Sequence, residues 1–464
     1  MKLLDTFSTI NKITAFALPI STSMLINTLS SFVAMIFVAR LGKLELAAGA
    51  LASSTFLVVM TVVSTVFYAI GILISHAKGQ DKTTHSLGEL VKAGFWLAVI
   101  LFIPSGIALS NADKILFLFK QDPQLILLTK SYFFYAALTM LPTLVGNVLI
   151  QFFIGIGRPR FMLFVSLLSL PVNLLISYGF ILGKFGLPQL ALAGITCTSF
   201  ITQSLVCLSI LVYLFCKKEF SSYDIFTGSL KPDWLLCKAI FTLGLPIGIQ
   251  FGAELAAIAV STYFMGYFGA TALAASQIVT QYAILAVMVT LGLSQGIGVL
   301  TSEAYGQQNL NLVKQYIYSA LLVLSVFFTL LFSIFLFLPH LLISAFIANN
   351  NANNADLIHL TVMLFAIAGF IQLADGVRNL LSGTLRGLQE AKAPMQIGVS
   401  CLWLLSIPLS YIVGFHLTHS PVGLRLGFLT GFIVAAFLLW KKTQEKLNSI
   451  EETGNWGQTS MALP

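Results

Sequence analysis

Long hydrophobic runs, separated by short polar or Gly- and Pro-containing segments, cover most of the chain. Each run is long enough to cross a bilayer, which takes about 17 to 25 predominantly apolar residues in a helix. Several runs are longer than this, and Pro142, Pro171 and Pro408 fall inside runs, so we expect tilted or kinked helices. The pattern predicts twelve transmembrane helices, over residues 14–38, 46–75, 90–110, 124–155, 161–183, 190–215, 238–267, 271–302, 315–339, 357–385, 394–415 and 422–440.

The composition excludes a soluble enzyme. Of the 464 residues, 57% are hydrophobic and only 9% are charged, whereas an ordinary soluble domain has about 25% charged residues. So few charges cannot cover a water-facing surface, but a lipid-facing surface needs none. We therefore predict an all-α membrane protein with the bilayer as its main surroundings.

The basic residues are distributed unevenly between the two sides of the predicted membrane. Of the 25 Lys and Arg residues, 17 lie in segments on the side of the two termini, seven lie on the opposite side, and Arg378 lies inside a span. Because cytoplasmic loops carry the excess of Lys and Arg, both termini are predicted to be cytoplasmic, with the chain in the cell (inner) membrane. The formal charge of +8 then reflects topology, and no nucleic-acid partner is expected.

An internal repeat divides the chain into two halves. Residues 17–80 align without gaps on residues 244–307, with 17 identities in 64 positions. Each half holds an even number of predicted spans, so the repeats are parallel, an arrangement typical of alternating-access transporters with a central cavity. The predicted organisation is an N-terminal lobe of helices 1–6 (1–216), a cytoplasmic linker (217–236), a C-terminal lobe of helices 7–12 (237–442) and a disordered cytoplasmic tail (443–464).

Two acidic residues lie deep inside predicted spans, Glu254 in the seventh and Asp375 in the tenth. A carboxylate at the bilayer centre costs roughly 2.5–3.5 kcal/mol on insertion scales, so we expect both to face a hydrated, protein-lined cavity. Their counterparts in the first half are Asn27 and Val145, which suggests that the C-terminal half handles a cation. A purely structural role, with carboxylates held by hydroxyl groups or by Arg378, is the alternative.

Arg378 follows Asp375 by three residues and could pair with it on the helix surface. Alternatively, it could extend toward the cytoplasmic interface. We favour partial pairing with Asp375, which would leave Glu254 as the better ligand for a proton or Na⁺. Polar side chains within other spans, including Asn173 and Gln281, could complete an oxygen-rich cation site, although hydrogen bonds between helices explain such residues equally well.

Sequence motifs for enzymes are absent. The chain has no Walker A sequence, no H-E-x-x-H and no G-x-S-x-G. We therefore expect no catalysis and no cofactor, and an ion gradient as the energy source. We also expect a monomer.

Four motifs, in this order and with this duplication, resemble the multidrug and toxic compound extrusion (MATE) transporters. They are Ala17-Leu-Pro-Ile, the turn that begins with Arg40-Leu-Gly-Lys together with its repeat partner at 269–275, Gly155-Ile-Gly-Arg-Pro159, and the segment from Ala374-Asp-Gly-Val-Arg to Leu-Arg-Gly387. The resemblance implies two six-helix lobes around a V-shaped cavity. It also implies export of small organic cations, such as drugs and dyes, in exchange for Na⁺ or H⁺.

In the NorM-like branch of that family, the cation site contains a Glu on helix 7, an Asp on helix 10 and an Asn on helix 5, which correspond here to Glu254, Asp375 and Asn173. Many members carry an Asp on helix 1 where this chain has Ala34. Some relatives have an aromatic residue where this chain has Ile371. These two departures from the family pattern argue against coupling through the first lobe, and they suggest a cation shell with fewer contacts than in those relatives.

Two other functions are possible alternatives. A lipid-linked oligosaccharide flippase of the same superfamily would need basic residues in its cavity to bind pyrophosphate, and Arg378 is the one candidate within a span. A channel would be expected to show a filter-like loop, which the sequence lacks.

Overall fold

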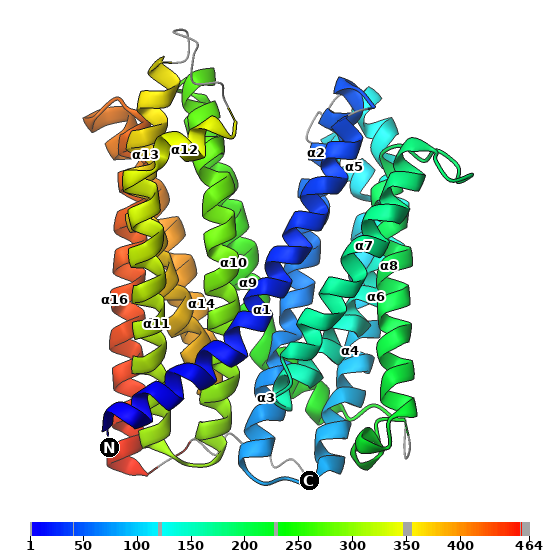
Figure 1. Ribbon diagram of the computed structural model, residues 1–464, viewed down its shortest axis with the longest axis vertical. Coiled ribbons are helices and arrows are strands. Elements are labelled where there is room, and N and C mark those ends of the chain that lie inside the picture. The colour runs from blue at the N-terminus through cyan, green and yellow to red at the C-terminus, as the bar shows by residue number, and fades with distance from the viewer. Residues whose placement is uncertain are drawn as a thin grey trace. The chain divides into compact units, whose positions relative to one another are not determined.

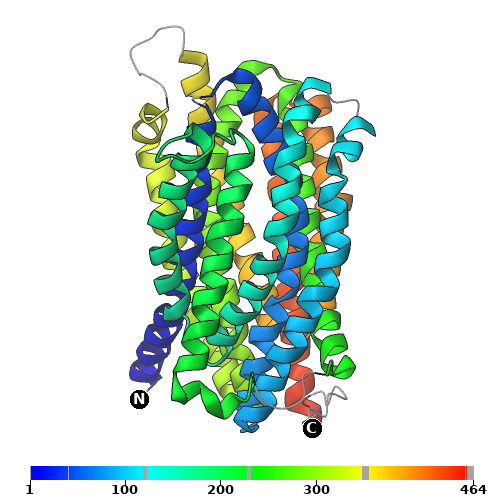
Figure 2. The same cartoon turned by 90° about the vertical axis from the view of Figure 1, so that its right-hand side faces the viewer.

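The computed structural model consists of long helices joined by short connections (Figures 1 and 2). It describes residues 2–39, 41–118, 123–226, 231–346, 355–454 and 456. Within this part of the chain, twelve helical segments are long and apolar enough to cross a membrane, and each corresponds to one of the predicted spans. The prediction of an all-α membrane protein with twelve transmembrane helices is confirmed.

The helices of the first half are α1 (Lys2–Ala39), α2 (Lys43–Val66), α3 (Tyr68–Gly79), α4 (Thr84–Ser110), α5 (Ala112–Leu118), α6 (Pro123–Gly155), α7 (Arg160–Leu182) and α8 (Ala193–Cys216). The second predicted span is divided between α2 and α3, which meet at Phe67. The short α5 follows α4 outside the predicted spans.

The helices of the second half are α9 (Trp234–Gly266), α10 (Ala270–Gly306), α11 (Leu310–Phe337), α12 (Pro339–Ser344), α13 (Ala355–Gly387), α14 (Lys392–Ser400), α15 (Ile407–Tyr411) and α16 (Pro421–Thr453). The eleventh span is irregular, because the π-helical segments η3 (Cys401–Ser406) and η4 (Ile412–Leu417) flank α15. Pro408 lies in the first turn of α15 and has no backbone N–H to continue the regular hydrogen-bond ladder.

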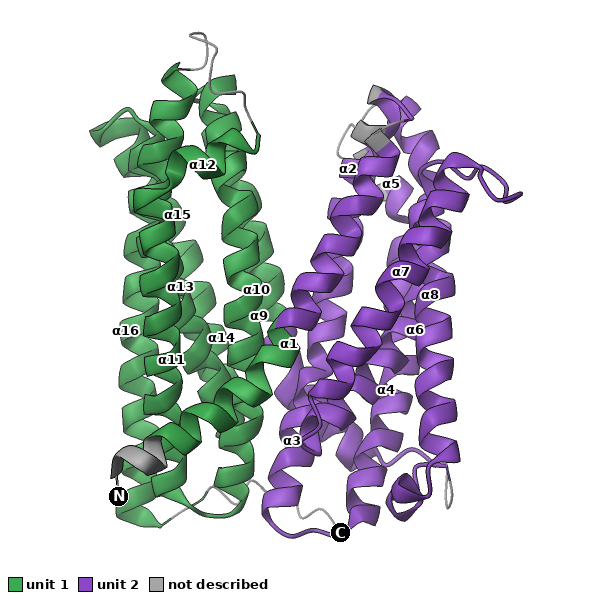
Figure 3. Cartoon of the chain, viewed as in Figure 1, with its two compact units in different colours: residues 1–21, 249–458 green, residues 22–248, 459–464 purple. Residues whose placement is uncertain are grey.

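The chain forms two compact units (Figure 3). Unit 1 comprises Met1–Ser21 and Ile249–Gln458, and the body of unit 2 is Thr22–Gly248. The boundaries between the two compact units therefore fall inside α1 and inside α9. The boundary predicted from the sequence lies in the linker at 217–236. The lobes 1–216 and 237–442 stay a prediction.

Part of the linker is folded onto unit 2. Residues Lys218–Tyr223 form a 3₁₀ helix, η1, in which Phe220 is buried against Phe152 and Phe153 of α6. Beside it, Arg158 donates a hydrogen bond to Glu219. This bond holds the pKa of the Glu219 carboxyl below its ordinary value and raises the pKa of Arg158.

The predicted disordered tail is wrong for residues 443–453, because α16 continues to Thr453. Thr443, Leu447 and Ile450 recur at helical spacing and are buried, so this polar segment has one face that packs on the protein. Lys314 also donates to Glu451 at 2.6 Å. Residues 455 and 457–464 lie outside the described residues.

Candidate functional site

Close packing of α10 against α13 sets the position of Asp375 on α13. A Cβ atom added to Gly383 would lie 2.2 Å from the backbone oxygen of Ser294, and one added to Gly387 would lie 2.4 Å from the backbone oxygen of Gly298. Glycine at these positions therefore lets the two backbones approach each other directly. Residues 378–387 of α13 are all buried as a result, and the polar side chains just before this stretch also face the interior of unit 1.

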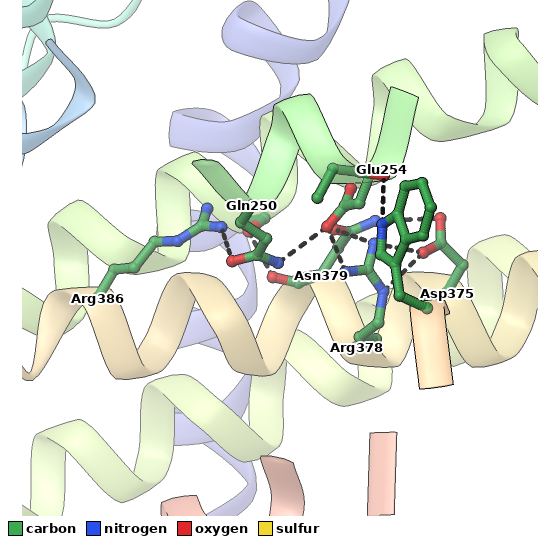
Figure 4. A network of polar contacts seen from close by, with 9 residues as sticks. Gln250, Glu254, Asp375, Arg378, Asn379 and Arg386 are labelled. Atoms are coloured by element: carbon green, nitrogen blue, oxygen red, sulfur yellow. Dashed lines mark hydrogen bonds and ion pairs between the residues drawn. The ribbon is translucent and has the colours of Figure 1, made fainter. Parts of the chain in front are cut away.

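Arg378 binds both of the acidic residues that lie within spans (Figure 4). Its Nε and Nη2 atoms donate to Oδ1 of Asp375 at 2.9 and 2.7 Å. Its Nη1 atom donates to Oε1 of Glu254, on α9, at 2.5 Å. The Arg378 side chain is 2% exposed, against 10% for Asp375 and 15% for Glu254. We call these three residues the charged triad.

Amide side chains extend the charged triad along α9 and α13. Asn379 Nδ2 donates to Oδ2 of Asp375 at 3.1 Å, and Gln250 Nε2 donates to Oε1 of Glu254 at 2.9 Å. Gln250 Oε1 in turn accepts a hydrogen bond from Nη2 of Arg386 at 2.8 Å. A continuous series of hydrogen bonds therefore runs from Asp375 to Arg386 (Figure 4).

Two expectations about Arg378 need correction. Arg378 does not extend toward the interface, because its guanidinium group is buried and binds two carboxylates. Partial pairing of Arg378 with Asp375 alone would have left Glu254 unpaired. Instead, Arg378 binds Glu254 as well. The reason is geometric: Nε and Nη2 of the guanidinium group bind Asp375, and its fork shape leaves Nη1 free to reach a second carboxylate on α9.

The remaining candidate residues are Asn173 and Asn27, which belong to unit 2, and Gln281, which belongs to unit 1. Asn173 accepts a hydrogen bond from Ser30 at 3.0 Å and donates to Thr202 at 3.4 Å. Asn27 and Gln281 are exposed. Gln281 lies on α10 in unit 1, and none of the hydrogen bonds found among the described residues joins it to the triad.

Sequence reasoning missed two polar residues of this site, Asn379 and Arg386. The tenth predicted span ends at residue 385, so Arg386 is one of the 17 basic residues expected on the cytoplasmic side, but it is buried in the last turn of α13. Both side chains lie on the face of α13 that carries Asp375 and Arg378, since Asn379 follows Asp375 by four residues and Arg386 follows Arg378 by eight. This helical spacing could have identified Asn379 and Arg386 as residues of the site.

The charged triad has one carboxylate oxygen available to a further cation. Oε1 of Glu254 and Oδ1 of Asp375 accept from Arg378, and Oδ2 of Asp375 accepts from Asn379. Oε2 of Glu254 accepts no hydrogen bond from the described residues, and Glu254 is the most exposed member of the triad. No group of three or more His, Cys, Asp or Glu residues in the described part of the chain could hold a metal ion. A cation here would therefore bind to Glu254 without a cage of carboxylates.

A family profile and curated relatives both match most of the chain. The MatE family profile matches residues 19–179 and 246–412, one segment in each half. The chain is 31% identical over 408 residues to the "Probable multidrug resistance protein NorM" of Agrobacterium fabrum, which covers 87% of each chain. It is 29% identical over 427 residues to the "Multidrug resistance protein NorM" of Burkholderia vietnamiensis, which covers 92% of each.

Solved transporter structures share the fold. One is an outward-facing multidrug resistance MATE family transporter, with a TM-score of 0.85 and 17% identity, over 96% of this chain and 97% of the other. Another is a MOP superfamily transporter from Pyrococcus furiosus, described as having a binding pocket of reverse polarity, with a TM-score of 0.86 and 17% identity over the same shares. Because the profile matches more than half of the residues and the NorM proteins align along most of them, the chain belongs to the MatE family, the MATE/NorM family of multidrug efflux transporters.

Proposed function

We propose that this protein is a secondary antiporter that exports small lipophilic organic cations in exchange for Na⁺ or H⁺, by alternating access. It would do so as a monomer in the cell (inner) membrane, with both termini in the cytoplasm. The observation that carries the proposal is the pair of carboxylates, Glu254 and Asp375, buried within spans of a chain that belongs to this family. Buried membrane carboxylates are expensive to insert and commonly mark ion or substrate pathways.

Exchange requires that the organic cation and the coupling ion favour different states of the carrier. A shared carboxylate meets this requirement, because occupancy by one cation weakens binding of the other. Glu254 is the better candidate for this role, since its Oε2 atom is available and its side chain is the most exposed of the triad. Asp375 would act mainly by holding Arg378 in place.

The flippase alternative gains no support from the site. A pyrophosphate group would need a basic side chain that is not already neutralised. The guanidinium of Arg378 binds two carboxylates, so its positive charge is already neutralised.

The experiment is transport of a fluorescent organic cation in proteoliposomes, with Na⁺ and H⁺ gradients imposed one at a time. We expect Glu254→Gln to insert normally and to lose gradient-driven efflux, because glutamine keeps the volume and the hydrogen bonding but removes the charge. Asp375→Asn should be milder, since Arg378 already neutralises most of that carboxylate.

Asp356→Asn is the matched control, because Asp356 lies on the same helix as Asp375 but is exposed in the first turn. It should transport like the wild type at equal protein content. If Glu254→Gln keeps the wild-type dependence on the ion gradient, Glu254 is structural and coupling takes place elsewhere.

A further inference from the structure

The charges of the triad do not cancel. Glu254 and Asp375 together carry two negative charges, and Arg378 supplies one positive charge. We propose that Arg378 is a fixed internal counter-ion that limits this site to one further positive charge, and thereby makes the transporter prefer monovalent over divalent organic cations. This inference rests on the proposed function, in which cations bind at Glu254.

The Arg378 side chain is held from several directions, as a fixed counter-ion requires. Its guanidinium carbon lies 5.5 Å from the ring centre of Phe432, on α16. A Cβ atom added to Gly398, on α14, would lie 3.6 Å from its Nη1 atom, so this helix passes close to the guanidinium. With 2% of the side chain exposed, Arg378 cannot leave the carboxylates without rearrangement of the helices around it.

The neighbouring Arg386 does not perform the same function. Its Nη2 atom donates to the amide oxygen of Gln250, and its guanidinium lies over the ring of Phe251 at 5.2 Å. The ion pairs of Glu254 and Asp375 in the described part of the chain are both with Arg378.

A monovalent cation at Glu254 Oε2 would bring the charge of the triad to zero. A divalent cation at the same place would leave one positive charge in surroundings of low dielectric constant, where an uncompensated charge is disfavoured. If Arg378 were neutral, the two carboxylates could accept a divalent cation instead. The charge of residue 378 should therefore set the preference between the two classes of substrate.

Ethidium and propidium are suitable probes, because they share one fluorescent ring system and carry one and two positive charges. Binding of each dye to the purified full chain in detergent would be followed by fluorescence anisotropy, and uptake would be followed in proteoliposomes. We expect the wild type to favour ethidium. In Arg378→Gln, the ratio of propidium affinity to ethidium affinity should rise at least about tenfold, which is a modest effect for one charge at such short range.

Three control variants separate charge from packing. Arg378→Lys keeps the charge and should keep the wild-type ratio. The double variant Arg378→Gln/Asp375→Asn returns the site to one negative charge and should restore the wild-type ratio. Arg425→Gln removes another arginine of unit 1, which binds the hydroxyl groups of Ser276 and Thr280, and should leave the ratio unchanged.

Arg378→Gln leaves two buried carboxylates without their partner, and a thermal stability measurement would show whether it folds. If it does not fold, Asn379→Asp adds a negative charge beside the same guanidinium, since Asn379 Oδ1 already accepts from Arg378 Nη2 at 3.2 Å. It should raise the propidium to ethidium ratio in the same direction.

An unchanged ratio in the folded variant, or a double variant that behaves like Arg378→Gln, would overturn this inference. If Glu254→Gln loses both dyes in that case, the proposed function stands and only the role of Arg378 is wrong. If Glu254→Gln binds and transports both dyes like the wild type, the proposed function itself fails.

Discussion

A guanidinium group that binds two carboxylates makes the stability of each residue depend on the others. Removing one partner of a buried ion pair leaves an uncompensated charge and typically costs about 3–5 kcal/mol. We expect Asp375→Ala and Arg378→Ala each to be strongly destabilising, and the double variant to be several kcal/mol less destabilised than the sum of the two. A double-mutant cycle on thermal unfolding in detergent measures this difference.

The control for this cycle combines Asp375→Ala with Arg425→Ala. Arg425 binds Ser276 and Thr280, so the two residues share no partner and their effects should add to within about 0.5 kcal/mol. Additive effects in the Asp375 and Arg378 cycle as well would mean that the ion pair contributes little to the folded state.

For the individual residues of the charged triad, the sequence predicted the contact between Asp375 and Arg378 on one helix. It did not predict the contact between Arg378 and Glu254, which lie on different helices. The spacing of three residues on one helix indicated pairing of Asp375 with Arg378, which the structure contains. The bond from Arg378 to Glu254 joins residues 124 positions apart, and it depends on how α9 is rotated against α13. Hydrophobic periodicity does not determine that rotation when both helices are apolar on nearly every face.

Direct contact between backbones sets the spacing of α10 and α13. Gly383→Ala places a methyl group where a Cβ atom would be 2.2 Å from the Ser294 oxygen, so one helix has to move. We expect a loss of about 1–3 kcal/mol in stability, the usual cost of overpacking, together with weaker binding of organic cations, because α13 carries Asp375 and Arg378. Thermal unfolding and dye binding on the same samples provide the measurement.

Gly146→Ala is the matched control. Gly146 is a buried glycine within α6, and a Cβ atom there would meet nothing within 4 Å. The same substitution should leave stability unchanged or raise it by up to about 1 kcal/mol, since alanine favours the helix. Equal behaviour of the two variants would show that the contact at Gly383 tolerates a shift at little cost.

The existence of the twelve spans could be predicted from the sequence, because their hydrophobic runs are long and their polar connections are short. The irregular parts of the spans could not be predicted from the sequence. The break at Phe67 and the π-helical segments on both sides of α15 are surrounded by apolar residues that would also suit a regular helix. The folded end of α16 was missed because its buried face consists of single residues, such as Leu447 and Ile450, within a charged segment.

The internal repeat predicts two similar halves, but packing within unit 1 shows where such symmetry ends. Residues 2–21 of α1 are part of unit 1, where Ser21 Oγ donates to the Val289 backbone oxygen at 3.0 Å. Lys12 Nζ donates to the Tyr316 hydroxyl at 2.6 Å. The contact of Ser21 depends on a small residue of α10, Gly292, whose added Cβ would lie 2.2 Å from Ser21 Oγ. A sequence alignment of the two halves carries no information about them.

The orientation of the whole molecule in the membrane can be tested with a cysteine that the chain already has. Cys216, at the end of α8, is exposed, and the other four cysteines are buried. The excess of basic residues predicts that this end of α8 lies in the cytoplasm. In intact cells, a membrane-impermeant thiol reagent should therefore leave the wild type unlabelled, and permeabilised cells should be labelled at Cys216.

Two variants in a Cys216→Ser background extend this test to both sides. Lys184→Cys, in the exposed connection after α7, should be labelled in intact cells, and Glu452→Cys, near the end of α16, should be labelled only after permeabilisation. The Asn-rich segment 349–355, which we also predict to face outward, lies almost entirely outside the described residues. Labelling of Cys216 and Glu452→Cys in intact cells, with Lys184→Cys protected, would reverse the orientation. The seven basic residues now assigned to the outside would then face the cytoplasm, against the distribution that normally sets topology.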